Sequence, residues 1–385
     1  MIDMLLNYRD KFDVKDDITY LNSAFMGLLP IESVKAGYKG IDIKSKAWGI
    51  HTKDFYNPPE RVRELASELL FCNKNDIFFI PSSSYGLATF ANNFNLKDEK
   101  TILLLEEEFP SNVYIWKELA IKQNAVIKFV KRPKDDDWTN EIINNIDENT
   151  GLISIPQTHW IDGAYIDLEK ISNHINNTDI ALAIDATQSA GILDLNINKI
   201  KPDVLVVSSY KWLLGPYSLG FAYIDKKYQI DSKPLEFNWM SMANEPEGDK
   251  FPDLLDYDND LHKSARRFDF GHRGNIHLMP ILESSLNFLK KIKTNNIKKH
   301  IETINKMIIA NISNLKVSVI EEKYRSPHYL GIRLENEISD NFIDSLSKNN
   351  IFISNRGKSS LRVSPHIWNN ENDVDKFIEN IKIII

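Results

Sequence analysis

The chain has 385 residues, of which 42% are hydrophobic and 26% charged, proportions that are ordinary for a globular protein. Its formal net charge of −7 argues against general binding to nucleic acids or anionic membranes, because both favour a basic surface. The one cysteine, Cys72, excludes an intrachain disulfide and a structural zinc site built on several thiolates.

Short apolar runs recur along the first two thirds of the chain, and each is nearly continuous rather than alternating. They lie at residues 77–80, 101–105, 125–130, 152–155, 180–184 and 204–207, and a further run at 220–224 follows a Gly-Pro turn. Continuous runs are typical of strands buried on both faces of a parallel sheet, and a spacing of about 25 residues leaves room for crossover helices. The sequence therefore predicts an α/β fold with a mostly parallel sheet between helices.

Helical patterns precede and follow this region. Pro58 is expected to start a helix that runs to Phe71, and residues 275–295 and 297–315 read as two long helices. Short strands are then expected at 317–320, 329–334 and 361–364, with a closing helix from Glu371.

The length of the chain exceeds the about 250–300 residues at which single cores stop growing, so we expect two domains. We expect a large α/β domain at residues 20–265 and a smaller C-terminal α+β domain at 266–385, with residues 1–19 packing on the latter. One continuous domain remains the alternative, because no Pro- or Gly-rich linker marks the boundary.

Polar residues follow three of the expected strands, at the edge where an open α/β sheet binds ligands. Ser82, Ser83 and Ser84 follow the first strand and could cradle a phosphate, or merely cap a helix. Asp185 ends a buried strand, where a carboxylate needs a cationic partner or serves as a helix cap. Lys211 follows another, where a lysine is unusual unless it reaches the surface.

Together these three turns supply the parts that pyridoxal 5′-phosphate (PLP) needs. Lys211 would form an imine with the cofactor, Asp185 would pair with the protonated pyridine nitrogen, and Ser83 and Ser84 would hold the phosphate.

The motifs Asp185-Ala186-Thr187-Gln188 and Tyr210-Lys211-Trp212 resemble those of the class V aminotransferase family of fold-type I PLP enzymes. This group includes cysteine desulfurases, isopenicillin-N-epimerase-like proteins and kynureninase. The resemblance runs from Tyr20-Leu21-Asn22-Ser23-Ala24 to the segment 361–369, close to the family's R-x-S-x-x-x-Y/W-N signature.

The resemblance implies further contacts with the cofactor. Gln188 matches the position that bonds the phenolic oxygen, and Ser208 matches a phosphate-binding position. Tyr210 stands where kynureninase has a tyrosine that reaches the phosphate. Phe109, in the segment Glu108-Phe109-Pro110-Ser111-Asn112, would stack on the pyridine ring, although without the resemblance it reads as a core residue.

The resemblance also implies a substrate site and a dimer. Arg362 matches the arginine that binds the substrate α-carboxylate, which suits a guanidinium fork. Asn22 and Ala24 would line the substrate pocket, and Trp160 would contact the substrate or simply pack on its wall. Gly271 and His272 fall where the family contacts the phosphate of the partner subunit, so we expect a homodimer with active sites at the interface.

The reaction is less defined than the cofactor. The loop 354–360, where desulfurases carry a catalytic cysteine, contains none, so a persulfide relay is not expected. We expect an aminotransferase-like enzyme that forms a carbanion at the substrate Cα, with a lyase that cleaves a Cβ–S or Cβ–Cγ bond as the alternative. A non-catalytic PLP-binding protein is an alternative of another class.

The location of the protein is an expectation from two features. The N-terminus lacks the basic start of a signal peptide, and no apolar run approaches the about 18 residues of a membrane span. A cytoplasmic protein that acts on a small amino-acid substrate is therefore expected.

Overall fold

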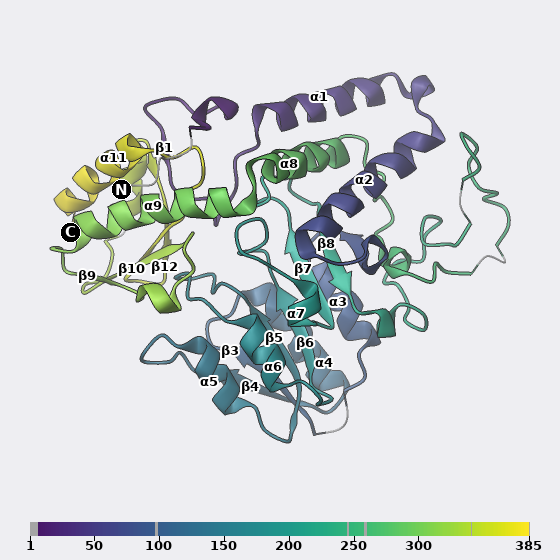
Figure 1. Ribbon diagram of the computed structural model, residues 1–385, viewed down its shortest axis with the longest axis horizontal. Coiled ribbons are helices and arrows are strands. Elements are labelled where there is room, and N and C mark those ends of the chain that lie inside the picture. The colour runs from purple at the N-terminus through teal and green to yellow at the C-terminus, as the bar shows by residue number, and fades with distance from the viewer. Residues whose placement is uncertain (1–6, 97–98, 245, 258–259, 340, 385) are drawn as a thin grey trace.

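A computed structural model describes residues 7–96, 99–244, 246–257, 260–339 and 341–384 of the chain (Figure 1). Its centre is a seven-stranded sheet in the order β2-β8-β7-β6-β5-β3-β4. The strands are β2 (Ile77–Ile80), β3 (Thr101–Leu105), β4 (Val126–Val130), β5 (Thr150–Pro156), β6 (Ala181–Asp185), β7 (Val204–Ser208) and β8 (Gly220–Ile224). Only β8 runs against its neighbours β2 and β7, so the predicted mostly parallel sheet is confirmed.

Side chains alternate between the two faces of this sheet and are buried on both. In β2, Ile77 and Phe79 join one hydrophobic cluster while Phe78 and Ile80 join another. Every residue of β2, β3, β5, β6, β7 and β8 is buried, whereas the edge strand β4 is largely exposed. This double burial explains why the runs are continuously apolar.

Helices cover both faces of the sheet and complete three layers. One face carries α3 (Ser83–Asn93) and α4 (Tyr114–Lys122). The helices whose apolar residues join the cluster on the other face are α2 (Thr52–Leu70), α5 (Trp138–Asn145), α6 (Leu168–His174), α7 (Ile197–Ile200) and α8 (Leu278–Ile292). The predicted α/β arrangement of helices around a sheet is thereby confirmed.

The C-terminal elements form a second, smaller α+β unit, which Figure 1 shows beside the main sheet in light green and yellow. Its antiparallel sheet has the order β12-β13-β10-β9 and packs with helices around a separate hydrophobic cluster. The elements are α9 (Thr294–Ile312), β9 (Val317–Val319), β10 (Leu330–Leu334), α10 (Phe342–Lys348), β11 (Ile351–Phe352), β12 (Ser354–Arg356), β13 (Ser360–Val363) and α11 (Glu371–Ile384).

The N-terminal segment lies against this smaller unit. Strand β1 (Thr19–Tyr20) pairs in parallel with β11, and the ring of Phe12 lies 4.9 Å from that of Trp368. The guanidinium of Arg9 donates to Asp373 at 3.1 Å. Helix α8, by contrast, packs on α1 (Ile31–Ser45) and α2, although it follows residue 265. The domain boundary near residue 265 therefore stays a prediction.

Two helices differ from the sequence-based expectation. Helix α2 begins at Thr52 rather than at Pro58, because Asp54 accepts the N–H of His51 at 2.8 Å and closes the first turn. Helix α1 was not predicted, because glycines interrupt its pattern. A Cβ at Gly40 would lie 2.4 Å from the Ile276 carbonyl oxygen, so this glycine permits the close approach of α1 to the chain before α8. No helix in the described parts of the chain is long and apolar enough to cross a membrane.

A buried ionic cluster fixes the turn at residues 269–274 to the edge of the main sheet. The Asp269 carboxylate, which is fully buried, accepts Arg63 at 2.7 Å and Arg273 at 2.8 Å. It also accepts the backbone N–H of Phe79 in β2 at 2.7 Å. Asp269 thus compensates two buried guanidinium groups and ties the turn to the sheet. Glu60 contributes to the same cluster, at 3.1 Å from Arg63 and 3.5 Å from Arg273.

We expect Asp269→Ala to lower the free energy of unfolding by about 3–5 kcal/mol, because two buried guanidinium groups then keep only the half-buried Glu60 as a carboxylate partner. Urea denaturation would measure the loss. As a control, Asp42→Ala removes an exposed pair with Lys46 and should change stability by less than about 1 kcal/mol. Equal losses in both variants would contradict this account.

Candidate active site

A cavity of about 320 Å³ lies where β6, β7 and α3 meet. Its walls come from the turns that follow the strands, which is where an open α/β sheet gathers polar side chains. The sequence-predicted residues that line it are Ser83, Ser84, Phe109, Trp160, Asp185, Gln188, Ser208, Tyr210 and Lys211. The structure therefore brings together nine residues that are dispersed along the chain.

Hydroxyl groups cluster at one end of the cavity. The Ser83 Oγ lies 2.8 Å from the Ser208 Oγ and 2.9 Å from the Thr187 Oγ1, so three elements converge on one point. Ser82 caps α3 through the N–H of Tyr85, and the first N–H groups of a helix have no acceptor inside the helix. Hydroxyls at a helix N-terminus are a suitable environment for a phosphate.

Lys211 is buried in the wall of the same cavity, near two aromatic rings. Its Nζ lies 5.6 Å from the centre of the Phe109 ring and 5.5 Å from that of Tyr210. Burial, reinforced by the positive charges of Arg362 and Arg356, lowers the pKa of Lys211 to about 7 against the opposing effect of Asp185. A large fraction of this amine is thus neutral and nucleophilic near neutral pH.

Asp185 places a carboxylate at the floor of the cavity. Its Oδ1 accepts the backbone N–H of Thr187 at 3.0 Å. Burial raises the pKa of Asp185, while the hydrogen bonds of Thr187 and the charge of Lys211 act against the shift. No Lys or Arg in the described ranges forms an ion pair with it, so this carboxylate has room for a cationic ligand group.

Glu108 is a wall residue whose side chain sequence reasoning missed. One carboxyl oxygen accepts the N–H of Phe109 at 2.6 Å, and the other is buried without a partner among the described residues. Burial, reinforced by the charge of Asp185, raises the pKa of Glu108 to about 8 against the effect of the Phe109 N–H. The carboxyl group is therefore largely protonated at neutral pH. Its position next to Phe109, a predicted site residue, was the sequence feature that could have identified Glu108.

Gln188 connects the cavity to the N-terminal segment. Its side-chain nitrogen donates to the carbonyl of Ala24 at 3.1 Å, and its oxygen accepts the indole N–H of Trp212 at 2.9 Å. Ala24 is buried behind Gln188 and does not line the cavity. Asn22 accepts the Ser354 hydroxyl at 2.8 Å, which places it toward β12 rather than on the cavity wall.

Trp160 and Arg362 link the cavity wall to the C-terminal unit. The Trp160 ring packs edge-on against Phe109 at 5.5 Å, and its carbonyl accepts Arg362 Nη1 at 3.3 Å. Arg362 is only 1% exposed, and its Nε and Nη2 atoms have no hydrogen-bond partner in the part of the chain that the structure describes. A buried guanidinium with two unused nitrogens is suited to a bidentate carboxylate ligand.

Gly271 and His272 lie outside this cavity. The N–H of Gly271 donates to Glu236 at 2.7 Å, and His272 is exposed on the turn that Asp269 anchors. Within one chain, these two residues do not contact the candidate site.

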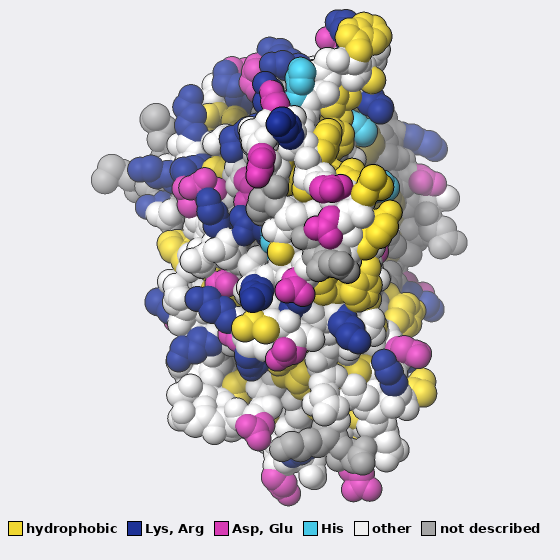
Figure 2. Space-filling view, turned by 90° about the vertical axis from the view of Figure 1, so that its right-hand side faces the viewer, with side chains coloured by type: hydrophobic (Ala, Val, Ile, Leu, Met, Phe, Trp, Pro, Cys, Tyr) yellow, Lys and Arg dark blue, Asp and Glu magenta, His cyan; other side chains and the backbone are white. Residues whose placement is uncertain are grey.

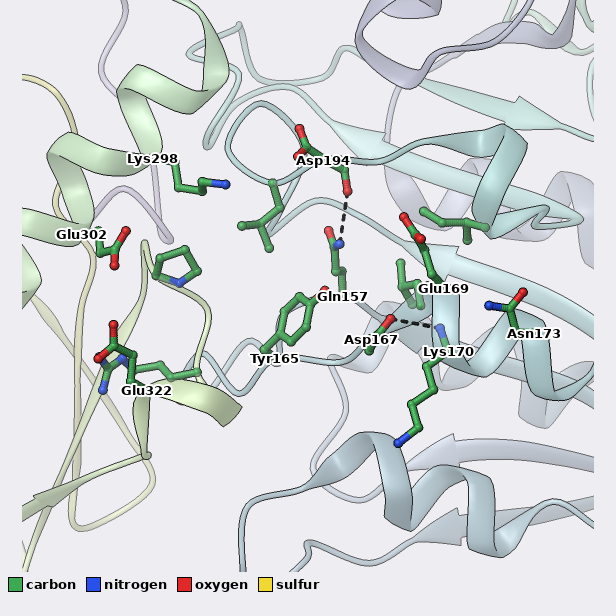
Figure 3. A pocket seen from close by; sticks show the side chains of 15 residues that line it. Gln157, Tyr165, Asp167, Glu169, Lys170, Asn173, Asp194, Lys298, Glu302 and Glu322 are labelled. Atoms are coloured by element: carbon green, nitrogen blue, oxygen red, sulfur yellow. Dashed lines mark hydrogen bonds between the residues drawn. The ribbon is translucent and has the colours of Figure 1, made fainter.

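A larger cleft of about 830 Å³ lies between α6 and the C-terminal unit, as Figure 3 shows. Four of its acidic side chains are already engaged. Lys306 pairs with both Glu302 and Glu322, Lys199 pairs with Glu169, and Asp167 caps α6 through the N–H of Lys170. None of the sequence-predicted site residues lines it. The chemistry of the molecule is therefore concentrated in the smaller cavity.

Comparison with known proteins relates most of the chain to one family. The family model described as "Aminotransferase class-V" matches residues 49–377. A probable cysteine desulfurase of Mycoplasma genitalium is 29% identical over 237 residues, which cover 60% of this chain and 55% of that protein.

Two solved structures share the fold over almost their whole length. The apo cysteine desulfurase of Thermococcus onnurineus NA1 has a TM-score of 0.83 at 17% identity, covering 100% of this chain and 99% of that one. A C-DES variant with glycine covalently linked to its PLP cofactor has a TM-score of 0.85 at 15% identity, covering 98% and 99%. These likenesses confirm the predicted fold-type I architecture.

Proposed function

Because the chain belongs to the class V aminotransferase family, we propose that it is a PLP-dependent enzyme that transforms an amino acid. The cofactor is pyridoxal 5′-phosphate, and Lys211 is the residue that carries it. The observation that supports this proposal most directly is a buried amine with a pKa of about 7, in one cavity with a hydroxyl cluster and a buried carboxylate.

The residues of the cavity fit the cofactor group by group. Ser83, Ser208 and the N-terminus of α3 suit the phosphate, and Asp185 suits a protonated ring nitrogen. Phe109 offers a ring for stacking. When bound, PLP supplies an aldehyde and an electron-withdrawing ring that can stabilise negative charge on the substrate Cα.

Three side chains of the protein have different roles in this reaction. The neutral Lys211 amine can take a proton from the substrate Cα and return it, because its pKa lies near neutral pH. Asp185 would hold the ring nitrogen of bound PLP in its charged form. Phe109 cannot transfer a proton, so it would orient the ring and exclude water from one face.

Arg362 is assigned to the substrate α-carboxylate. We expect Arg362→Ala to raise the KM for amino acids about 10- to 100-fold while the cofactor absorbance stays intact, because a charge-assisted contact to substrate is lost. Steady-state kinetics and the visible spectrum measure the two effects. Arg362→Lys should restore part of the loss, and release of the cofactor from Arg362→Ala would show that the residue serves another purpose.

Transamination is the proposed reaction, with a lyase as the second candidate. The relatives named as desulfurases favour the lyase, but the described loop 354–360 has no cysteine. The only thiol, Cys72, is half-buried, and burial raises its pKa to about 12. A persulfide step on this chain's own thiolate is therefore disfavoured.

One experiment decides among these reactions. The holoenzyme is mixed with a panel of L-amino acids, and spectra and products are followed together. An oxo acid with pyridoxamine phosphate supports transamination, whereas sulfide, alanine, or pyruvate with ammonia supports the lyase. A spectrum that no amino acid changes would favour the non-catalytic PLP-binding alternative and contradict the proposal.

We also propose that the enzyme is a homodimer in which Gly271 and His272 reach the partner's phosphate. Figure 2 shows a band of hydrophobic side chains on one face of the molecule, and large exposed apolar areas mark interaction surfaces. Exposed large hydrophobic residues include Tyr38, Ile41, Trp48, Leu255 and Tyr257. Sedimentation equilibrium that returns the monomer mass of 44.4 kDa would contradict the dimer.

A further inference from the structure

Most arginines of the chain are paired with carboxylates. The arginines in ion pairs are Arg9, Arg61, Arg63, Arg132, Arg266, Arg273 and Arg333. Four arginines form no ion pair with a carboxylate of the described residues. Arg267 and Arg325 instead donate to backbone carbonyls. The other two, Arg356 and Arg362, lie beside the active-site cavity, where their charges lower the pKa of Lys211. They lie on adjacent strands, where β12 and β13 run antiparallel and Ser354 faces Arg362.

Arg356 lies against the wall of the active-site cavity. Its guanidinium carbon is 5.2 Å from the centre of the Trp160 ring, and that ring packs on Phe109. Its Nη1 donates to the neighbouring carbonyl of Asn355 at 2.6 Å, while its Nε is buried without a partner among the described residues. The stacking on Trp160 fixes the plane of the guanidinium and leaves donors unused.

The charge of Arg356 acts on Lys211, and the charge of Arg362 acts on Arg356. Burial and the charge of Arg362 lower the pKa of Arg356 to about 10, and Arg356 itself contributes to the lowered pKa of Lys211. The opposing effect on the pKa of Arg356 comes from Tyr329 and not from a carboxylate. Two partly desolvated guanidinium groups thus repel each other without a carboxylate from the chain.

A ligand with two anionic groups would relieve this repulsion. In the proposed function, on which this inference rests, Arg362 takes the substrate α-carboxylate. We propose that Arg356 binds a second anionic group, on the substrate's side chain, so that the substrate class is amino acids with an acidic side chain. The planar fork of Arg356 suits a carboxylate, whose two oxygens lie in one plane with its carbon.

The test compares ligands that differ in one charge. Calorimetry on the holoenzyme measures binding of succinate and glutarate against their monoamides, succinamate and glutaramate, which have nearly the same shape and cannot be transformed. We expect each dicarboxylate to bind about tenfold or more tightly than its monoamide, as a charge-assisted contact predicts. The same ranking is expected for kcat/KM with L-aspartate and L-glutamate over L-asparagine and L-glutamine.

Arg356→Gln should abolish the preference by weakening only the dicarboxylates. The matched control is Lys358→Gln, which removes an exposed cation of the same loop that pairs with Glu337, and it should keep the preference. Equal affinities of the two ligand types for the parent enzyme would overturn the inference. An equal loss for both types in Arg356→Gln would also overturn it, because Arg356 would then serve the α-carboxylate or the fold.

Failure of this inference is distinguishable from failure of the proposed function. If borohydride treatment does not fix the cofactor on Lys211, or no amino acid reacts, the proposed function itself is wrong. If borohydride fixes the cofactor on Lys211 and an amino acid reacts, but ligands with acidic and with amide side chains bind equally well, only the role of Arg356 is wrong. Should Arg356→Gln fail to fold, the ligand series on the parent protein still decides.

Discussion

The Lys211→Ala variant is expected to lose amino-acid turnover by on the order of 10⁴-fold or more, because one side chain supplies both the nucleophile and the proton carrier. The cofactor, when it binds at all, will be released on dialysis rather than fixed by borohydride. Product assays and mass spectrometry of the reduced protein measure the two effects. Lys170→Ala, which removes a lysine from the larger cleft, should leave both unchanged.

The pH dependence of cofactor incorporation tests why Lys211 reacts. The amine attacks an aldehyde only when it is neutral, and burial lowers its pKa to about 7. The rate of incorporation into the apoprotein should therefore rise between about pH 6 and 8 and then level off. A rate that keeps rising toward pH 10 would show an ordinary, solvated lysine and would contradict the proposed environment.

The central residues of this site could be predicted from the sequence because the parallel sheet brings the ends of its strands together. Asp185, Ser208 and Lys211 end or follow neighbouring parallel strands, and the carboxyl ends of such strands meet at one edge. Ser83 joins them because β2 is parallel to β7 through the shared neighbour β8. An apolar run followed by a polar residue was sufficient to locate these side chains.

The site residues that were not predicted depend on contacts between distant segments, which no local sequence pattern reveals. Glu108 follows the acidic residues Glu106 and Glu107 and reads as part of a solvated turn, yet burial makes its carboxyl group largely neutral. Arg356 was noticed only as part of a loop without a cysteine. Its position over Trp160 arises from the docking of the C-terminal sheet on the main domain.

Substitution of Asp185 is expected to lower turnover of the enzyme strongly without lowering the stability of the apoprotein. Asp185→Asn keeps an acceptor for the Thr187 N–H but cannot hold a charged ring nitrogen. We expect turnover to fall about 10²- to 10⁴-fold, because a buried charge pair is broken. The cofactor should still become attached to Lys211, which spectroscopy after borohydride reduction would show.

The stability of the apoprotein should not fall in the Asp185→Asn variant. Burial raises the folded-state pKa of Asp185 above its unfolded value, so between the two values the folded state binds more protons and stability falls as pH rises. The neutral amide removes this penalty, so apo Asp185→Asn should resist urea at least as well as the parent at pH 7. A variant that is both less active and less stable would indicate a structural role. The predicted combination, a slower enzyme on an apoprotein that is no less stable, indicates that the carboxylate serves the cofactor and not the fold.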